Sequence, residues 1–442
     1  MGTGYLRQFR VQAAQWLIGA MIALCGVIGA SHPAQGCPFC QAFRSPFSND
    51  LRNARYVVVA DALPLPPVAA GAVRPSSSTE RWPEAVDNGG GTHRESRKGD
   101  TDKVNADDDE DEEEGEETAR PARQFMVIKV LKGGSAVRVG AKIEAASASL
   151  DLPPSEHSTC LLFGFDSPEL TWTTPVIIHK SSESYLRQVA QLKSAGRSRL
   201  RFFLDWLDHS DPAVAGDAYN EFALAPYNDL VALKDDLDRN WLKQRIGDPR
   251  TDEMRMRLYL TMLGIAGTPE DAPNVLELIA VLESRADLAL DAAVACYLSL
   301  QGDRGLPVVE QRYFANPDMA TRNVYSAICA LTFHGDEPRR IARERVATSL
   351  ATALQHAKLA DLVIAKLAAW QHWESTPRVA QVFKQADTQH AYLRQAAVRY
   401  LRMSLHPEAD ELLEELKRID PQSVAQSESF QPIPPPDGTE ND

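Results

Sequence analysis

The heptapeptide TMLGIAG at residues 261–267 recurs as CYLSLQG at residues 296–302 and as CALTFHG at residues 329–335. The copies begin 35 and 33 residues apart, and each ends in a glycine: Gly267, Gly302 and Gly335. Their apolar residues are three and four positions apart, the spacing of a helix with one buried face. Each glycine stands where a helix C-cap is expected, since glycine adopts the left-handed conformation of a cap at no steric cost. The stretch therefore predicts a repeated helical unit.

Helical periodicity continues on both sides of these copies, over residues 181–420. Helix starts are predicted at four steps in which proline follows Asp211, Thr268, Thr376 or His406, because proline suits the first turn of a helix. A period of this length with two helices per unit is typical of an α-solenoid, in which each helix pair buries its apolar face against the next. We expect about six imperfect units.

The pattern of residues 37–180 is different and predicts β-structure. Short runs rich in Val, Ile and Phe lie between Gly, Pro and Ser residues and predict strands at residues 55–63, 125–131, 137–143 and 159–165. No long helical pattern separates them, which favours a small barrel or sandwich. The predicted fold class is multi-domain α and β, with a small β-barrel followed by an α-solenoid.

Two segments have the composition of disordered chain. Residues 64–121 are rich in Pro, Gly, Ser and charge and form a predicted insert in the β domain; residues 421–442 form a predicted tail. The insert contains the acidic run DDDEDEEEGEE at residues 107–117. A calcium loop is not indicated, because aligning Gly115 with the sixth position of such a loop places Pro121 where its bidentate glutamate belongs.

Residues 1–36 have the three parts of a secretory signal peptide. Arg7 and Arg10 precede the apolar core WLIGAMIALCGVIGA at residues 16–30, and the sequence AQG at residues 34–36 places small residues at positions 34 and 36, before a cut. We expect a secreted or periplasmic protein with no membrane span after signal removal, because no later apolar run reaches the length of a span. The alternatives are a retained signal anchor and a lipid on Cys37, although Ala34 stands where a lipobox usually has leucine.

The charge of the chain argues against nucleic acid as a partner. The formal net charge is −14, and the acidic run alone contributes ten carboxylates. No basic face is visible in the sequence, and binding to nucleic acid depends on one.

Five cysteines follow the predicted signal, and export makes a disulfide expected. Three are disulfide candidates, Cys37, Cys40 and Cys160; either Cys37 or Cys40 could pair with Cys160, or the two ends of CPFC could pair with each other. The odd number leaves at least one free thiol. Cys296 and Cys329 hold equivalent repeat positions among apolar residues and are interpreted as small core residues.

Two alternatives give CPFC a chemical role. A Cys-x-x-Cys pair can have a lowered thiol pKa, although here Pro38 follows the first cysteine and no thioredoxin-like pattern surrounds it. A zinc site could combine Cys37 and Cys40 with His157 and Cys160, although the spacing is long for a zinc ribbon. Neither alternative is favoured, and common catalytic motifs are absent from the sequence, so we expect no enzyme activity and no cofactor.

Both regions resemble known families. The helical region resembles HEAT-like repeats. The β region resembles the netrin-type OB-fold barrel of tissue inhibitors of metalloproteinases, through the amino-terminal cysteine pair, the VLKG turn at residues 130–133 and Cys160 opening an LLFG strand. With RLYLTMLG and FHG, the chain also resembles a group of exported bacterial proteins without an assigned activity.

The inhibitor resemblance implies that a terminal cysteine chelates a protease's zinc through its α-amine and carbonyl. This sequence departs from the family's Cys-x-Cys, because two residues separate Cys37 from Cys40, which places that role in doubt.

The functional expectation is an exported, non-enzymatic interaction protein that binds a protein or peptide in the groove of its helical repeats. Trp370, His372 and Trp373 are the candidate partner-binding residues, because aromatic side chains are frequent in binding hot spots. Core packing is the competing role for at least one of the tryptophans. The alternative function is thiol-redox chemistry or metal binding at CPFC.

Overall fold

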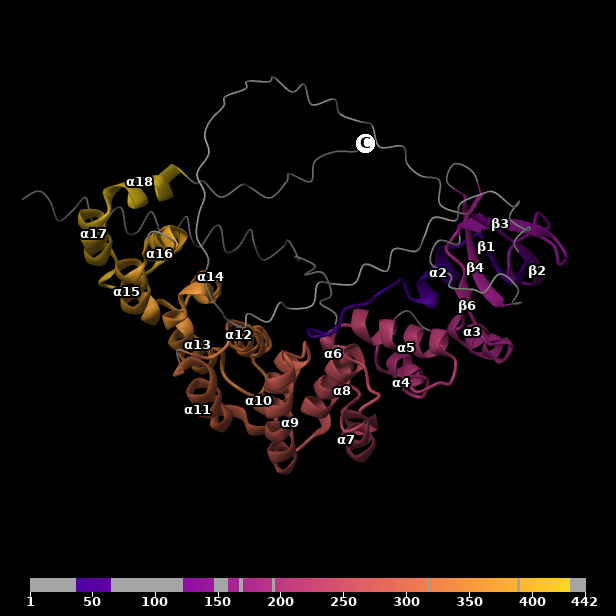
Figure 1. Ribbon diagram of the computed structural model, residues 1–442, viewed down its shortest axis with the longest axis horizontal. Helices are drawn as coiled ribbons and strands as arrows, with labels where there is room; N and C mark the ends of the chain where they lie inside the picture. The colour runs from indigo at the N-terminus through magenta and orange to yellow at the C-terminus, as the bar shows by residue number, and fades with distance from the viewer. Residues whose placement is uncertain are drawn as a thin grey trace, which may run out of the picture. The chain divides into compact units, whose positions relative to one another are not determined.

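The computed structural model describes residues 37–64, 122–146, 158–166, 170–192, 195–316, 318–387 and 390–429. These residues form two compact units (Figure 1). The sheet unit spans residues 50–182; the helical unit comprises residues 37–49 and the described residues from Glu183 onwards. The predicted signal peptide, residues 65–121 of the predicted insert and residues 430–442 lie outside the described residues. The mixed α and β fold class is confirmed.

The sheet unit contains six short strands, β1 (Tyr56–Ala62), β2 (Ala122–Lys132), β3 (Lys142–Ala146), β4 (Thr159–Asp166), β5 (Leu170–Trp172) and β6 (Val176–Ile177). Their order is β3-β2-β1-β4-β5, with β6 also paired to β4. Every pairing is antiparallel, and the sheet is nearly closed into a barrel-like form. The predicted barrel is confirmed at this level.

One predicted strand was placed too early. Residues 137–141 form a turn instead of a strand, because Gly140 adopts a φ of +84° and its N–H donates to the carbonyl of Val127 at 2.8 Å. Strand β3 begins only at Lys142. Val137 still packs in the core of the unit, which explains why its apolar neighbourhood resembled a strand.

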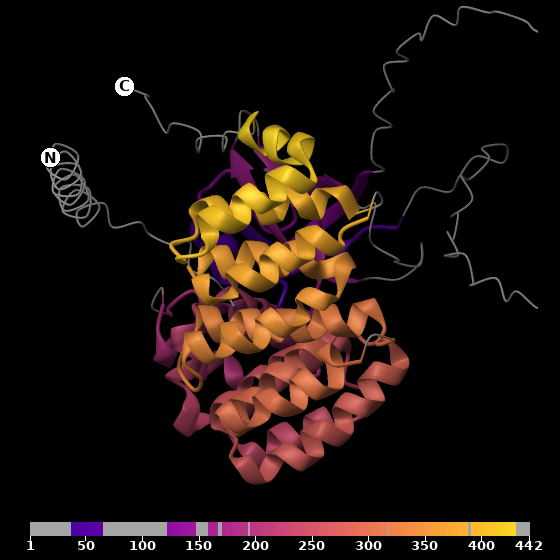
Figure 2. The ribbon, with the colours of Figure 1, turned by 90° about the vertical axis from the view of Figure 1, so that its left-hand side faces the viewer.

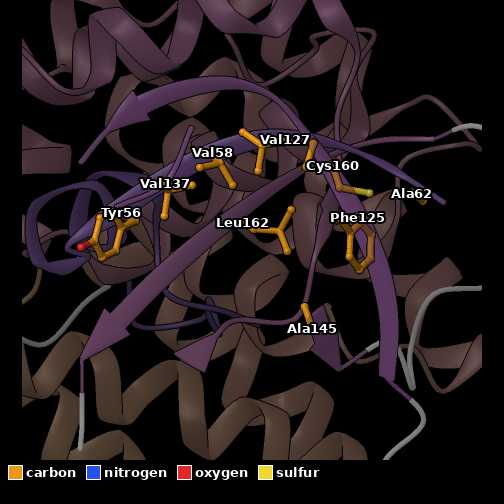
Figure 3. Packing of buried hydrophobic residues seen from close by; sticks show 10 residues of the cluster. Tyr56, Val58, Ala62, Phe125, Val127, Val137, Ala145, Cys160 and Leu162 are labelled. Carbon is orange, nitrogen blue, oxygen red and sulfur yellow. The ribbon is translucent and has the colours of Figure 1, made fainter. Parts of the chain in front are cut away.

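Alternate residues of β1 form the centre of the sheet unit's core (Figure 3). Tyr56, Val58 and Ala60 lie on one face and pack with Phe125 and Leu162. The VLKG sequence, expected to be a turn, instead supplies the last three residues of β2, and Gly133 follows that strand directly. Gly133 has a φ of +138°, and a Cβ there would lie 2.6 Å from the Tyr56 ring, so only glycine fits.

The helical unit contains these α-helices: α2 (Phe47–Asn53, shared with the sheet unit), α3 (Glu183–Val189), α4 (Arg197–Leu204), α5 (Pro212–Leu224), α6 (Tyr227–Val231), α7 (Arg239–Ile246), α8 (Glu253–Ala266), α9 (Ala272–Arg285), α10 (Leu290–Gln301), α11 (Leu306–Val309), α12 (Thr321–Asp336), α13 (Arg343–Leu350), α14 (Ala360–Ala369), α15 (Thr376–Gln385), α16 (Ala391–Met403), α17 (Ala409–Ile419) and α18 (Pro421–Ser429). Short 3₁₀ segments connect several of them: η1 (Lys180–Ser182), η2 (Lys234–Asp236), η3 (Pro269–Asp271), η4 (Gly302–Gly305), η6 (Ala351–Gln355), η7 (Ala357–Leu359) and η8 (Trp373–Ser375); η5 (Glu310–Phe314) is a π-helical turn.

These helices pack mainly on near neighbours in the chain. Helix α10 contacts α8, α9 and α12, whereas α16 contacts α14, α15, α17 and α18. Figure 2 shows the same order as layers that run from the red helices to the yellow ones. Helix α18 occupies the first nine residues of the predicted tail, so the helical chain continues beyond residue 420.

The predicted caps agree with the structure in two of the three repeats. Gly267 caps α8, and Gly302 caps α10 with a φ of +60°. Gly335 does not cap a helix but lies within α12, where a Cβ would come 2.2 Å from the indole ring of Trp370. This third glycine is required by close packing rather than by a left-handed backbone.

The helix start predicted at Asp211 is confirmed. Asp211 caps α5, and its carboxylate accepts a hydrogen bond from the N–H of Ala213 at 2.9 Å. Within the described residues, no helix combines the length and the apolar character that crossing a membrane requires.

Candidate functional site

Residues 37–48, here called the N-terminal segment, lie along helix α5 of the helical unit. The N–H of Cys37 donates to the carbonyl of Ala223 at 3.1 Å, and the N–H of Phe43 donates to the side chain of Asn220 at 3.2 Å. Because these partners succeed one another by helical turns, the segment follows one face of α5. The predicted mature start thus packs on helices, although it was expected to belong to the β domain.

A fully buried carboxylate anchors the far end of this segment. Asp217 of α5 accepts hydrogen bonds from the N–H of Phe47 at 2.6 Å and from the hydroxyl of Tyr185 at 2.7 Å. Burial raises the pKa of Asp217 to about 7, although both hydrogen bonds act in the opposite direction.

A buried ion pair lies beside it. Arg199 Nη2 is 2.5 Å from Glu221 Oε2, and the two side chains are 8% and 6% exposed. Ser48 joins the pair, because its hydroxyl donates to Glu221 at 2.5 Å and accepts from Arg199 at 2.6 Å. The segment is therefore held by charge and hydrogen bonding that water does not reach.

These anchoring residues were not predicted from the sequence. Asp217, Asn220 and Glu221 are three polar side chains on an otherwise apolar helix, PAVAGDAYNEFAL, and all are buried. They stand at positions i, i+3 and i+4, so they share one helix face. Polar residues at core positions of a helix are a usable signal for a buried partner, since unpaired burial is costly.

At the start of the segment, Cys37 and Cys40 form a disulfide with their Cα atoms 5.1 Å apart. This is one of the pairings that the sequence left open. Cys160 is instead a free thiol in the core of the sheet unit, and burial raises its pKa to about 11. The amide N–H of Cys37 is already bonded to Ala223, which does not favour the inhibitor-like role.

The zinc alternative finds no assembled site among the described residues. Cys37 and Cys40 are bonded to each other, and His157 lies outside the described residues. Within the described ranges, no three His, Cys, Asp or Glu side chains are grouped so that they could hold a metal ion.

Next to the disulfide lies a hollow of about 820 Å³, which we call the CPFC pocket. Cys37, Pro38 and Phe39 line one side, and Tyr227 of α6 with side chains of α10, α12 and α14 line the rest. Arg257 of α8 fixes this side of the pocket, because it donates to the carbonyl of Phe39 and pairs with Asp291 of α10 at 2.8 Å.

The surface of the CPFC pocket is mainly apolar. Phe333 packs edge-to-face on Phe39 and on Tyr227, with ring centroids 5.1 and 5.2 Å apart. Tyr325 of α12 and Leu362 of α14 also line the pocket and remain 49% and 44% exposed. Large apolar side chains that stay in contact with water inside a hollow are typical of a binding surface.

The charged groups at the pocket are paired within the protein. Lys366 Nζ lies 3.1 Å from Asp336, and Arg339 lies 3.4 Å from Glu337. Burial raises the pKa of Asp291, and its partner Arg257 opposes this shift. Apolar contact, and not net charge, is therefore the main property that the CPFC pocket offers.

The pocket also contains a thiol, that of Cys329. Burial raises its pKa, and a hydrogen bond with Tyr325 only partly opposes this rise. The thiol consequently stays protonated near neutral pH, unlike an activated nucleophile. Burial also raises the pKa of the fully buried Cys296 thiol.

The three predicted partner-binding residues do not line the CPFC pocket. Trp370 packs on Gly335, and its indole N–H donates to Asp336 at 2.8 Å. His372 is buried with Nδ1 2.8 Å from the hydroxyl of Ser375. Trp373 packs edge-to-face on Tyr400 at 5.3 Å. Their contacts stabilise the connection between α14 and α15.

No family model, curated protein or solved structure matches this chain. The HEAT-like and netrin-like descriptions thus remain resemblances in sequence.

The raised pKa of Asp217 predicts an unusual pH dependence of stability. The folded state binds this proton more tightly than the unfolded chain, so the stabilisation is complete below about pH 4 and is lost as pH rises through about 7. Thermal unfolding followed by circular dichroism should show the midpoint of the wild type falling between about pH 5 and about pH 8. The fall should be smaller in Asp217→Asn and unchanged in the control Asp303→Asn, whose residue is exposed. Equal pH dependence in all three proteins would show that Asp217 is not the cause.

Proposed function

We propose that this protein is an exported, non-enzymatic interaction protein that binds an apolar peptide segment of its partner in the CPFC pocket. In this proposal the helices form a HEAT-like solenoid, and the pocket is part of its groove. The observation that carries the proposal is the pair of exposed apolar side chains, Tyr325 and Leu362, which face a hollow of about 820 Å³. A pocket of this size accommodates several side chains of a peptide.

The polar groups around the pocket support a peptide as the ligand. Thr332, Asp336, Glu337 and Lys366 line the same hollow as the apolar side chains. Binding sites of this kind combine an apolar surface with a few polar groups that orient the ligand. Peptide backbone carries donors and acceptors at every residue and can use such groups.

The disulfide supports the proposed compartment and the stiffness of the pocket. Disulfides persist mainly in oxidising compartments outside the cytosol. The Cys37–Cys40 bond closes the turn that bears Phe39, and Arg257 holds the carbonyl of that residue. A wall held in this way loses little conformational entropy when a ligand binds.

Thiol-redox chemistry at CPFC remains the alternative function, and two observations weigh against it. Cys37 is only 4% exposed, so a partner thiol has little access to its sulfur. The raised pKa of Cys329 also leaves the second cysteine that lines the pocket without thiolate character.

Filling the pocket tests the proposal. A random-peptide library displayed on phage is selected against the purified protein, and fluorescent copies of the enriched peptides are titrated by fluorescence polarisation. Ala365 of α14 lines the pocket, and Ala365→Trp should weaken binding by about tenfold or more because the indole occupies ligand space. Ala391→Trp, at an exposed position of α16, is the matched control and should bind like the wild type. No enriched peptide, or equal binding by all three proteins, would refute the proposal.

A further inference from the structure

A second hollow, of about 310 Å³, adjoins the CPFC pocket. The two share Tyr227, Phe333 and Glu337 as lining residues. The second is also lined by Lys234, Arg339 and Arg340, and we call it the basic pocket. An apolar and a cationic hollow thus lie on either side of one aromatic wall.

The three cations of the basic pocket differ in whether they have a partner within the protein. Arg339 donates to the side chain of Asn228, lies 3.4 Å from Glu337 and places its guanidinium 5.6 Å from the centre of the Tyr227 ring. Lys234 and Arg340 are exposed and have no ion-pair partner within the described part of the chain. Two positive charges therefore remain available to a ligand at the edge of the shared wall.

The positive charges of the basic pocket also act on Tyr227, which lines both hollows. Burial raises the pKa of the Tyr227 hydroxyl to about 12, and the positive charges of Arg339 and Arg340 act against that rise. Arg339 and Arg340 line the basic pocket together with Tyr227, so one ligand there can meet the ring and both guanidinium groups.

We infer that the partner peptide carries a carboxylate within a few residues of its apolar segment, with the apolar side chains in the CPFC pocket and the carboxylate beside Lys234 and Arg340. This inference rests on the proposed function and specifies the ligand. Charge complementarity carries it: an anionic group would pair with two cations that have no ion-pair partner among the described residues, and such pairing sets the specificity of an interface. The carboxylate is that of an Asp or Glu side chain or of the peptide's C-terminus.

The test compares charge-matched variants and charge-matched probes. Peptides enriched from the phage library are synthesised in three forms: with the acidic residue, with lysine in its place, and with an amidated C-terminus. The double variant Lys234→Glu with Arg340→Glu should bind the acidic form about tenfold or more weakly and the lysine form more tightly than the wild type. The control, Arg345→Glu with Lys358→Glu, makes the same charge change at exposed positions outside both pockets and should bind like the wild type. Loss of affinity on amidation identifies the C-terminus as the anion, whereas loss with the lysine form identifies a side chain.

The outcomes separate this inference from the proposed function. Peptides that are sensitive to Ala365→Trp but show no acidic preference and no response to the double variant would overturn the inference alone. Absence of any peptide bound at the CPFC pocket would overturn the proposed function and the inference with it. Binding of oleate in place of every peptide, again sensitive to Ala365→Trp, would show a lipid-like carboxylate as the occupant and would also overturn the inference.

Discussion

Replacing Arg199 by methionine is expected to lower the free energy of unfolding by about 3 to 5 kcal/mol, because the change leaves the carboxylate of Glu221 buried without its partner. Ser48 also loses the hydrogen bond that it accepts from this arginine, so the N-terminal segment loses one of its anchors. Denaturant unfolding followed by circular dichroism measures the loss.

Two variants control for this result. Arg199→Met combined with Glu221→Leu should recover most of the stability, since replacing both members of a buried pair by apolar residues is often close to neutral. Arg201→Met breaks a pair with Asp205 whose side chains are 43% and 66% exposed, and it should cost less than about 1 kcal/mol. A cost for Arg199→Met no larger than that of Arg201→Met would contradict the role assigned to the buried pair.

Replacing Phe39 by alanine is expected to lower the stability by about 3 kcal/mol and also to weaken peptide binding. Phe39 is 6% exposed and packs on Phe333, so its removal opens a cavity and deletes one wall of the CPFC pocket. Unfolding and fluorescence polarisation measure the two effects on the same protein.

The matched control is Phe43→Ala in the same segment. Phe43 is 58% exposed and does not line the pocket, so its loss should affect stability less and leave peptide affinity unchanged. Wild-type affinity in Phe39→Ala would show that the N-terminal segment is not part of the binding surface.

The helical character and the caps at Gly267 and Gly302 could be predicted because they depend on local spacing. At Gly302, where φ is +60°, the cap also uses the conformational freedom of glycine. Gly335 has the same spacing but a different cause. A glycine is needed at position 335 because the indole ring of Trp370 packs on it. Trp370 comes 35 residues later, at the end of α14. Local sequence does not encode which ring will cover a glycine.

The place of CPFC could not be predicted for a similar reason. CPFC lies close to the first strand in the chain, which suggested that it belongs to the sheet unit. The residues that anchor the N-terminal segment are instead 170 to 177 residues away, at Asp217 and Asn220 of α5. Only the presence of those polar residues on an apolar helix hinted that a partner had to exist. The disulfide within CPFC was one of the pairings left open, and the structure selects it.

The candidate binding residues were the least predictable part. The candidates Trp370, His372 and Trp373 were chosen because aromatic residues are crowded there. In the structure these side chains stabilise the turn between α14 and α15. Tyr325 and Leu362, which face the CPFC pocket, look in sequence like ordinary members of apolar helix faces. Their exposure depends on how α12 and α14 are spaced, which is a tertiary property.

Photo-crosslinking from Leu362 tests most directly whether the CPFC pocket binds peptide. A photoreactive phenylalanine replaces either Leu362, in the pocket, or Leu405, which is 82% exposed and outside it, and each protein is irradiated with an enriched peptide. If the CPFC pocket binds peptide, a crosslink to the peptide is expected from position 362 and none from position 405. A crosslink from position 405 with none from position 362 would contradict binding in this pocket.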